Sequence, residues 1–238
     1  MKKAIIIGAT SGIGNGLAKI LVNNNYKVGI TGRRTELLQK LKSENPNLYF
    51  DKTFDITNCK ETVEKLNELK TELGGLDLLI ISSGTGDLNQ KLDSEIEKRT
   101  IETNVKGFTC VANWAFNYFE GQKSGHLVAI SSVGGIRGSR IAPAYNASKS
   151  FQINYLEGLR QKSKKLNTEI YITDVRPGFV ETDMAKGEGQ FWVATVEKAA
   201  QQIYNAIKKK KKIVYVTKRW KLIALILKRV PRQIYDRM

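Results

Sequence analysis

Tyr145 and Lys149 lie four residues apart in the segment PAYNASKS, and Ser132 precedes the tyrosine by thirteen residues. Residues four apart on a helix share one face, so the Lys149 ammonium can lie beside the Tyr145 phenol. A positive charge there favours the phenolate and lowers the pKa of a tyrosine from its usual value of about 10. The spacing therefore predicts a tyrosine that acts as a general acid and base near neutral pH.

Gly8, Gly12 and Gly14 stand in the segment GATSGIG, directly after a short apolar run at residues 4–7. Glycine lets a backbone turn tightly and approach a pyrophosphate, and the N-terminus of the following helix attracts the negative charge. Many strand-to-helix turns need glycine for geometry alone, but a position after the first strand favours nucleotide binding. We therefore expect a nucleotide phosphate at this turn.

The second apolar run ends in Thr31, Gly32, Arg33 and Arg34. A site for NAD(H) usually has a carboxylate here for the adenine ribose hydroxyl, whereas this chain has two arginines. Two guanidiniums suit a 2′-phosphate. The alternative is a solvated arginine pair at the start of a helix, where positive charge is mildly unfavourable. The pair predicts NADP(H) as the cofactor in preference to NAD(H).

Strand-like and helix-like segments alternate along the chain. Apolar runs rich in Ile, Val and Leu recur at residues 4–7, 27–30, 48–50, 76–81, 126–130, 170–175 and 213–216, with amphipathic stretches such as 59–72 and 93–119 between them. Continuous apolar strands separated by helices predict a doubly wound α/β Rossmann fold, with a parallel sheet of about seven strands covered on both faces. We expect one domain over residues 1–216 and a basic, amphipathic C-terminal extension over residues 217–238.

The formal net charge of +16 is concentrated at the C-terminal end, where residues 208–238 carry a net charge of +11. The segment LIALIL at residues 222–227 is too short to span a membrane. Its cationic flanks, with Trp220 and Tyr235 at the borders, suit a helix that lies in a membrane interface. The alternative is that its apolar residues pack on the body of the protein or on a second subunit. The five lysines at 208–212 favour an anionic membrane surface, and no motif for nucleic-acid binding is present.

The remaining signals concern the compartment and metal sites. Cys59 and Cys110 lack metal-ligand spacing and indicate no disulfide framework, which predicts a cytoplasmic protein with Cys110 in the core. The apolar run at 4–7 is shorter than that of a secretory signal, so we expect a buried strand there. The single histidine, His126, is expected to be structural, and the acidic residues at 93–97 to begin a helix. We predict no metal site.

Together these residues resemble the short-chain dehydrogenase/reductase family. The resemblance covers about residues 3–216 and rests on six elements in the family's order: GATSGIG, Asp55 in FDIT, Asn104 in ETNVKG, Ser132 in AISSVGG, YNASK, and Arg176-Pro177-Gly178 in RPGFVET. The family usually reads N-N-A-G after the fourth strand, whereas this chain reads Ile81-Ser82-Ser83-Gly84. The hydrogen bonds that brace the central sheet must therefore differ.

The resemblance implies a role for each matching residue. Tyr145 would protonate a carbonyl oxygen as hydride arrives, or deprotonate an alcohol in the reverse direction, and Lys149 would lower its pKa and bind the nicotinamide ribose. Ser132 would polarise the substrate oxygen, and Asn104 would hold a water in the proton relay. Asp55 and Ile56 would flank the adenine, and residues 177–182 would hold the nicotinamide carboxamide. The implied cofactor site comprises Gly8, Thr10, Ser11, Gly12, Ile13, Gly14, Arg33, Arg34, Asp55, Ile56, Ser83, Gly84, Asn104, Tyr145, Lys149, Pro177, Gly178, Val180 and Thr182.

The implied function is that of an NADP(H)-dependent oxidoreductase, either a carbonyl reductase or an alcohol dehydrogenase, acting on a small molecule. The alternative is a nucleotide-sensing or scaffold protein on the same fold, which would not need the complete catalytic set. Residues expected to contact the substrate are mostly apolar and suggest a hydrophobic ketone, aldehyde or alcohol: Val133, Gly134, Ile136, Phe179, Met184, Phe191 and Trp192. A homo-oligomer, dimer or tetramer, follows by analogy only.

Overall fold

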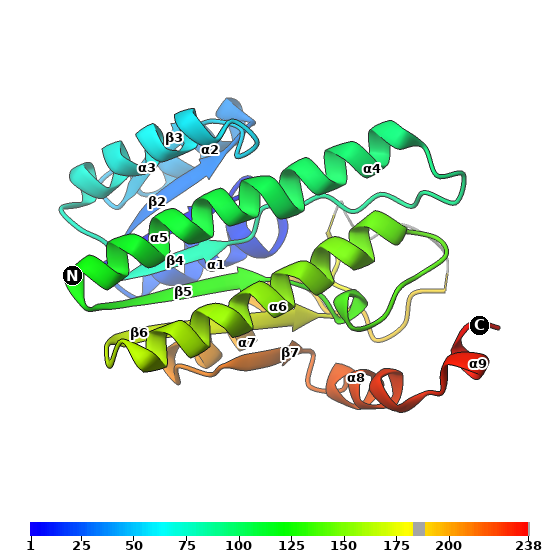
Figure 1. Ribbon diagram of the computed structural model, residues 1–238. Coiled ribbons are helices and arrows are strands. Elements are labelled where there is room, and N and C mark those ends of the chain that lie inside the picture. The colour runs from blue at the N-terminus through cyan, green and yellow to red at the C-terminus, as the bar shows by residue number, and fades with distance from the viewer. Residues whose placement is uncertain (183–188, 238) are drawn as a thin grey trace.

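The computed structural model describes residues 1–182 and 189–237. Among these residues a seven-stranded parallel sheet lies between two layers of helices (Figure 1). The strand order is β3-β2-β1-β4-β5-β6-β7, with β1 Lys2–Ile7, β2 Tyr26–Gly32, β3 Tyr49–Thr53, β4 Leu78–Ile81, β5 Ser124–Ile130, β6 Glu169–Pro177 and β7 Ile213–Val216. The predicted doubly wound α/β fold is confirmed, and every predicted apolar run overlaps a strand.

Helices cover both faces of the sheet because successive strand residues point to opposite sides. Ile6 belongs to the core under α1 Gly12–Asn23, α2 Thr35–Glu44 and α7 Val196–Lys208. Ile5 and Ile7 belong to the core under α3 Cys59–Leu73, α5 Phe108–Gln122 and α6 Pro143–Lys165. The remaining α-helices are α4 Ser94–Ile101, α8 Trp220–Arg229 and α9 Arg232–Tyr235, beyond the carboxyl ends of the strands (Figure 1). Within the described ranges, no helix has the length and apolar character needed to cross a membrane.

The predicted helical stretch 93–119 contains an irregular turn. Asp93 caps α4 by accepting a hydrogen bond from the Glu95 amide at 2.9 Å, as expected for a charged helix start. Between α4 and α5 the chain then forms a π-helical turn, Glu102–Gly107. Such turns occur frequently at functional sites. Here the turn leaves the carbonyl oxygen of Asn104 to accept a hydrogen bond from the Gln152 side chain on α6, at 2.9 Å.

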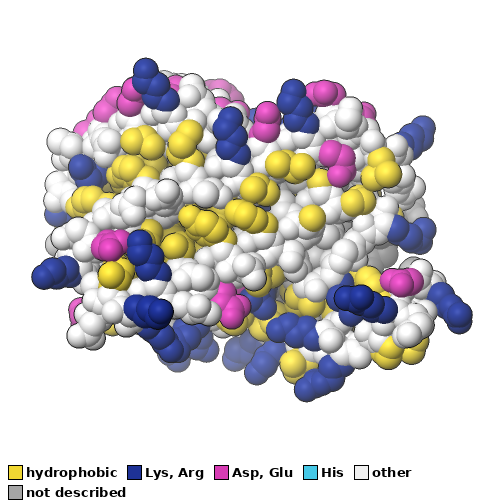
Figure 2. Space-filling model, in the orientation of Figure 1, with side chains coloured by type: hydrophobic (Ala, Val, Ile, Leu, Met, Phe, Trp, Pro, Cys, Tyr) yellow, Lys and Arg dark blue, Asp and Glu magenta, His cyan; other side chains and the backbone are white. Residues whose placement is uncertain are grey.

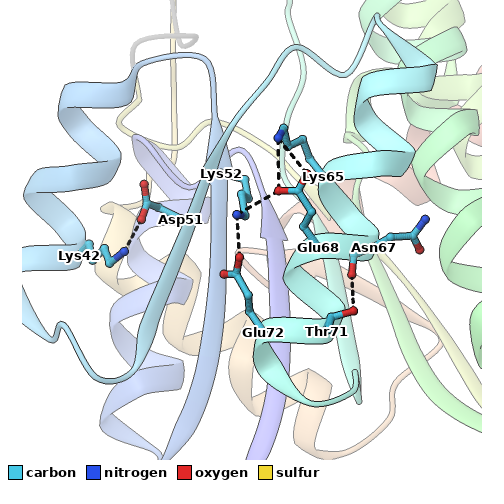
Figure 3. Close-up of polar contacts among 8 residues, drawn as sticks. All are labelled: Lys42, Asp51, Lys52, Lys65, Asn67, Glu68, Thr71 and Glu72. Carbon is cyan, nitrogen blue, oxygen red and sulfur yellow. Dashed lines mark hydrogen bonds and ion pairs between the residues drawn. The ribbon is translucent and has the colours of Figure 1, made fainter.

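Ion pairs cover the edge strand β3 (Figure 3). Lys52 on this strand pairs with Glu68 at 3.0 Å and with Glu72 at 2.7 Å, both on α3. Asp51 pairs with Lys42 of α2 at 2.7 Å. Charged side chains on an exposed edge discourage pairing with strands of other molecules. Because the pairs are partly solvated, each contributes little to stability, about 1 kcal/mol or less.

The prediction that the cysteines form no disulfide is wrong, because Cys59 and Cys110 are joined by one. Cys59 begins α3 and Cys110 lies near the start of α5, and these helices cover the same face of the sheet. Their packing brings the two Cα atoms to 5.9 Å across 51 residues of sequence. Cys110 is also partly exposed, so it does not belong to the core. The bond removes the cysteine argument for a reducing compartment.

His126 is buried in β5, where its Nε2 lies 2.8 Å from the Thr173 hydroxyl. Burial, aided by the nearby charge of Lys210, lowers the pKa of His126 to about 4. In the unfolded chain the pKa is about 6.5, so the unfolded state binds more protons between pH 6.5 and 4. Stability must therefore fall as the pH is lowered through this window.

We predict that the free energy of unfolding, measured with urea, decreases by up to about 3 kcal/mol between pH 6.5 and 4 through His126 alone. His126→Gln is expected to remove this part of the pH dependence, because glutamine does not titrate. An identical pH dependence in the variant and in the parent protein would contradict the assignment.

Candidate active site

A cleft of about 760 Å³ lies at the carboxyl ends of the strands. Its walls come from the segments that follow β1, β2, β4, β5 and β6, together with the start of α6. β1 and β4 are neighbours in the sheet while β2 lies on the other side of β1, so the chain order reverses at this place. Doubly wound sheets bind ligands at such switch points.

Most of the predicted site residues line this cleft. Those that do are Gly8, Thr10, Ser11, Gly12, Ile13, Arg33, Arg34, Asp55, Ile56, Ser83, Gly84, Ser132, Tyr145, Lys149, Pro177, Gly178, Val180 and Thr182. Gly14 and Asn104 lie behind its wall. Of the predicted substrate contacts, Val133, Gly134 and Phe179 line it, while Ile136, Phe191 and Trp192 do not. Met184 lies outside the described residues.

The glycines of the first turn allow the backbone of β1 to touch that of the segment after β4. Gly8 has a positive φ of 87°, and a Cβ atom there would lie 2.7 Å from the Ser83 amide nitrogen. A Cβ atom on Gly14 would lie 2.0 Å from the Gly8 carbonyl oxygen. Gly14 therefore packs the start of α1 against β1 and does not itself face the cleft. The result is a narrow backbone cradle that fits a pyrophosphate at the N-terminus of α1.

Two arginines border the cleft at the end of β2. The Nη2 atom of Arg34 donates to the hydroxyl of Thr10 at 2.9 Å and to that of Ser11 at 2.8 Å. Arg33 is largely exposed and lies 3.4 Å from Asp55. Burial works to raise the pKa of Asp55, but hydrogen bonds from Thr57 and the Arg33 charge outweigh it and hold that pKa below its usual value. Two guanidiniums and two hydroxyls thus meet at one edge of the site.

Tyr145 and Lys149 lie on α6, one turn apart, and Ser132 follows β5. The Ser132 hydroxyl accepts a hydrogen bond from the Gly134 amide at 3.0 Å and also interacts with the Tyr145 phenol. The neighbouring Ser131 is buried and donates instead to the Asp174 carboxylate. Of the two serines, Ser132 is therefore the one placed beside Tyr145, as the sequence predicted.

The Lys149 ammonium does not contact the phenol oxygen as the helical spacing suggested. Its Nζ atom donates to the Ile130 carbonyl at 3.0 Å and to Gln152 Oε1 at 3.1 Å, and lies 5.8 Å from the Tyr145 ring centre. Burial raises the pKa of Tyr145, while the hydrogen bond with Ser132 acts to lower it. The pKa of Tyr145 is therefore raised and not lowered as expected. Burial of the phenolate has the largest effect, and the Lys149 ammonium donates its hydrogen bonds to other acceptors.

Burial lowers the pKa of Lys149 to about 8, against the opposing attraction of Asp174. The ammonium is therefore protonated below pH 8 and loses its proton above it. We predict that kcat/KM falls as the pH rises through about 8, because kcat/KM reports ionisations of the free enzyme. A profile that stays flat to pH 9.5 (roughly one and a half units higher) would contradict this role for the ammonium.

Asn104 occupies the π-helical turn and is fully buried. Its Oδ1 accepts from the Thr85 amide at 2.9 Å, and its Nδ2 donates to the Thr85 carbonyl at 2.7 Å and to Ser148 Oγ at 3.0 Å. These bonds fix the segment after β4, which lacks the family's usual asparagines. Gln152, which the sequence analysis missed, joins Lys149 to the Asn104 carbonyl. Gln152 could have been identified from the sequence, because it lies three residues after Lys149 on the same helix and so shares its face.

Gly86 is a second residue that the sequence analysis missed. A Cβ atom at this position would lie 2.7 Å from Cε2 of the Tyr145 ring, so the glycine backbone forms the surface against which the phenol packs. The motif comparison ended at Gly84 and gave no reason to select it.

We predict that Gly86→Ala lowers kcat about tenfold or more, because displacing a catalytic group by a fraction of an ångström misaligns it. The matched control is Gly138→Ala, since Gly138 is also a loop glycine but has open space around its Cβ position. The assay is steady-state kinetics, with circular dichroism to check the fold. Equal kcat values for the two variants would show that Gly86 does not position Tyr145.

The C-terminal segment forms part of the same cleft. Trp220, Ile223 and Leu227 of α8 line it. A Cβ atom on Gly178 would lie 1.9 Å from the indole of Trp220. The start of α8 therefore packs directly against the backbone of the segment after β6. Trp220 also lies within aromatic contact of three residues that follow β6, and we call these four the aromatic cluster: Phe179, Phe191, Trp192 and Trp220. The predicted alternative of packing on the body is thus realised for this face of the tail.

Comparisons with known proteins identify the family of this chain. Residues 2–191 match the family described as short chain dehydrogenase. An uncharacterised oxidoreductase of Myxococcus xanthus is 34% identical over 188 residues, covering 77% of this chain and 74% of the relative. One from Mycobacterium tuberculosis is 32% identical over 196 residues, covering 77% and 75%. The chain therefore belongs to the short-chain dehydrogenase/reductase family and is an oxidoreductase of the NAD(P)-using type.

Solved structures show the same fold at low sequence identity. A short chain dehydrogenase from Burkholderia cenocepacia in complex with NADP aligns with 100% of this chain and 98% of its own, with a TM-score of 0.86 and 21% identity. A serine dehydrogenase complexed with NADP+ aligns over 90% of this chain and 93% of its own, with a TM-score of 0.81 and 24% identity.

Proposed function

We propose that this protein is an NADP(H)-dependent carbonyl reductase or alcohol dehydrogenase acting on a hydrophobic small molecule. The observation that carries the proposal is the convergence of Ser132, Tyr145 and Lys149 on one cleft that begins at the glycine cradle. The cofactor, when bound, supplies or accepts hydride at the carbonyl carbon. Tyr145 protonates the carbonyl oxygen while Ser132 donates a hydrogen bond to it, and Lys149 stabilises the phenolate that remains.

The preference for NADP(H) rests on Arg33 and Arg34. A 2′-phosphate at this edge would meet both guanidiniums and the hydroxyls that Arg34 already contacts, Thr10 and Ser11. Several structurally similar proteins have been solved with NADP or NADPH bound, which supports the same choice. The lining of the cleft includes Val133, Phe179 and Trp220, which favour an apolar substrate.

We predict that Arg33→Ala and Arg34→Ala each weaken NADPH binding by about tenfold or more while changing NADH binding little, because only NADPH carries the 2′-phosphate. Nicotinamide fluorescence in a titration measures both affinities. The matched control is Lys19→Ala, which removes an equal charge from the far end of α1, where Lys19 pairs with Glu44. Equal loss of NADH affinity in the arginine variants would count against a 2′-phosphate site.

The competing function is that of a nucleotide sensor or scaffold without turnover. Tyr145→Phe separates the two, because it removes the proton donor and keeps the ring that packs on Gly86. The reductase proposal expects unchanged NADPH affinity and a loss of turnover by at least about a hundredfold. NADPH binding without reduction of any carbonyl compound by the parent protein would favour the sensor.

The proposal extends to assembly and location. A homo-oligomer, dimer or tetramer, stays an expectation by analogy with the family. The basic segment 217–238 is proposed to contact a membrane surface from the cytoplasmic side, where the anionic leaflet attracts Lys and Arg. We propose no nucleic-acid partner.

A further inference from the structure

α8 presents apolar side chains on two opposite sides. On the inner side Trp220 and Ala224 are buried, with 5% and 1% of their surfaces exposed, and Ile223 and Leu227 line the cleft. These positions recur every three or four residues and therefore share one face of the helix. The inner face of α8 is thus a wall of the active site.

The outer side of α8 carries an exposed apolar stripe formed by Leu222, Leu225 and Ile226. These side chains are 60%, 39% and 58% exposed. Three large aliphatic side chains on one solvent-facing helix surface are unusual, because a soluble helix normally turns polar residues outward. The stripe therefore marks a contact surface.

Cations border the exposed apolar stripe. On the period of 3.6 residues per turn, Lys221 and Lys228 fall along one side of it and Arg219 along the other. In the described part of the tail, Asp236 is the only acidic residue. The lysines 208–212 do not adjoin α8 as predicted, since they precede β7 and a strand of four residues separates them by about 13 Å. Figure 2 shows that Lys and Arg side chains gather along the bottom of the molecule in this view.

Contacts with the body hold α8 and α9 in place. The Arg137 guanidinium donates to the carbonyl oxygens of Leu227 at 3.3 Å and Val230 at 3.1 Å. It also lies 4.2 Å from the ring centre of Tyr235, whose hydroxyl donates to the Gly138 carbonyl. The orientation of the exposed apolar stripe relative to the cleft is therefore fixed: a surface that receives the stripe lies on one side of α8, and the cleft lies on the other.

We propose that α8 docks on an anionic lipid bilayer through the exposed apolar stripe, and that lipophilic aldehydes or ketones dissolved in that bilayer reach Tyr145 along its inner face. Aliphatic side chains bordered by cations match an anionic interface in both polarity and charge. The second half of this inference rests on the proposed reductase function. In the reaction the carbonyl carbon receives hydride from NADPH and its oxygen receives the Tyr145 proton, which gives an alcohol and NADP+.

Docking is tested by sedimentation of the full-length protein with phosphatidylglycerol vesicles and with phosphatidylcholine vesicles. We expect binding to the anionic vesicles only, weakened by added salt. The double variant Leu222→Ser/Ile226→Ser should bind about tenfold more weakly or worse, since two inserted aliphatic side chains are lost. The matched control, Ile101→Ser, replaces an aliphatic side chain that is 50% exposed on α4 and should bind like the parent protein. Unchanged binding of the double variant would overturn the proposal.

Point variants are used because deleting the tail would also remove Trp220 from Gly178 and open the cleft. A change of oligomeric state in the double variant, seen by light scattering and without any change in vesicle binding, would assign the exposed apolar stripe to a second copy of the chain and overturn lipid docking.

Delivery is tested by NADPH oxidation with two aldehydes, one of short chain in solution and one of long chain dissolved in the vesicles. We expect phosphatidylglycerol vesicles to raise kcat/KM for the long-chain aldehyde about tenfold over phosphatidylcholine vesicles in the parent protein, and not in the double variant. Both proteins should reduce the short-chain aldehyde equally. Equal rates on both lipids would refute delivery. If neither aldehyde is reduced, the reductase function and delivery both fail, whereas docking is still decided by sedimentation.

Discussion

The buried ammonium of Lys149 is the constraint on which the catalytic end of the structure depends. A charge removed from water must be met by hydrogen bonds or opposite charge. Here the Ile130 carbonyl at the end of β5 and the Gln152 side chain on α6 provide the hydrogen bonds. Asp174 on β6 adds favourable charge and is itself paired with Arg176 at 2.7 Å. Three neighbouring elements are thereby fixed around one side chain.

The same network reaches the segment after β4. Gln152 also donates to the Asn104 carbonyl, which the π-helical turn leaves open, and the Asn104 side chain clamps Thr85. The next residue, Gly86, meets the Tyr145 ring. The position of Tyr145 thus depends on a chain of contacts that leads from α6 to the π-helical turn, then to the segment after β4, and back to α6. The family's asparagines after β4 are replaced here by serines, and Asn104 provides the bracing from the other side.

The C-terminal segment changes what the cleft can accept. Without α8 the segment after β6 would face solvent. With α8 in place, Trp220 packs against Gly178 and against the other members of the aromatic cluster, and Trp220 and Phe179 form an apolar wall of the cleft. Such a wall suits the hydrophobic substrate proposed above, and the exposed apolar stripe lies on the opposite side of α8. A charged substrate would find few polar partners there.

The sequence by itself determined the sheet, the glycine cradle and the family, because strand and helix periodicities and short motifs are local properties. Only the tertiary structure decided that Cys59 and Cys110 meet, that Lys149 points to Ile130 and Gln152, and that Gly86 and Trp220 belong to the site. These contacts join residues remote in the chain or depend on which way a side chain turns. Long-range contacts and side-chain orientations do not follow from the spacing of residues in the sequence. Both depend on the competition between burial and hydrogen bonding in the fully assembled core.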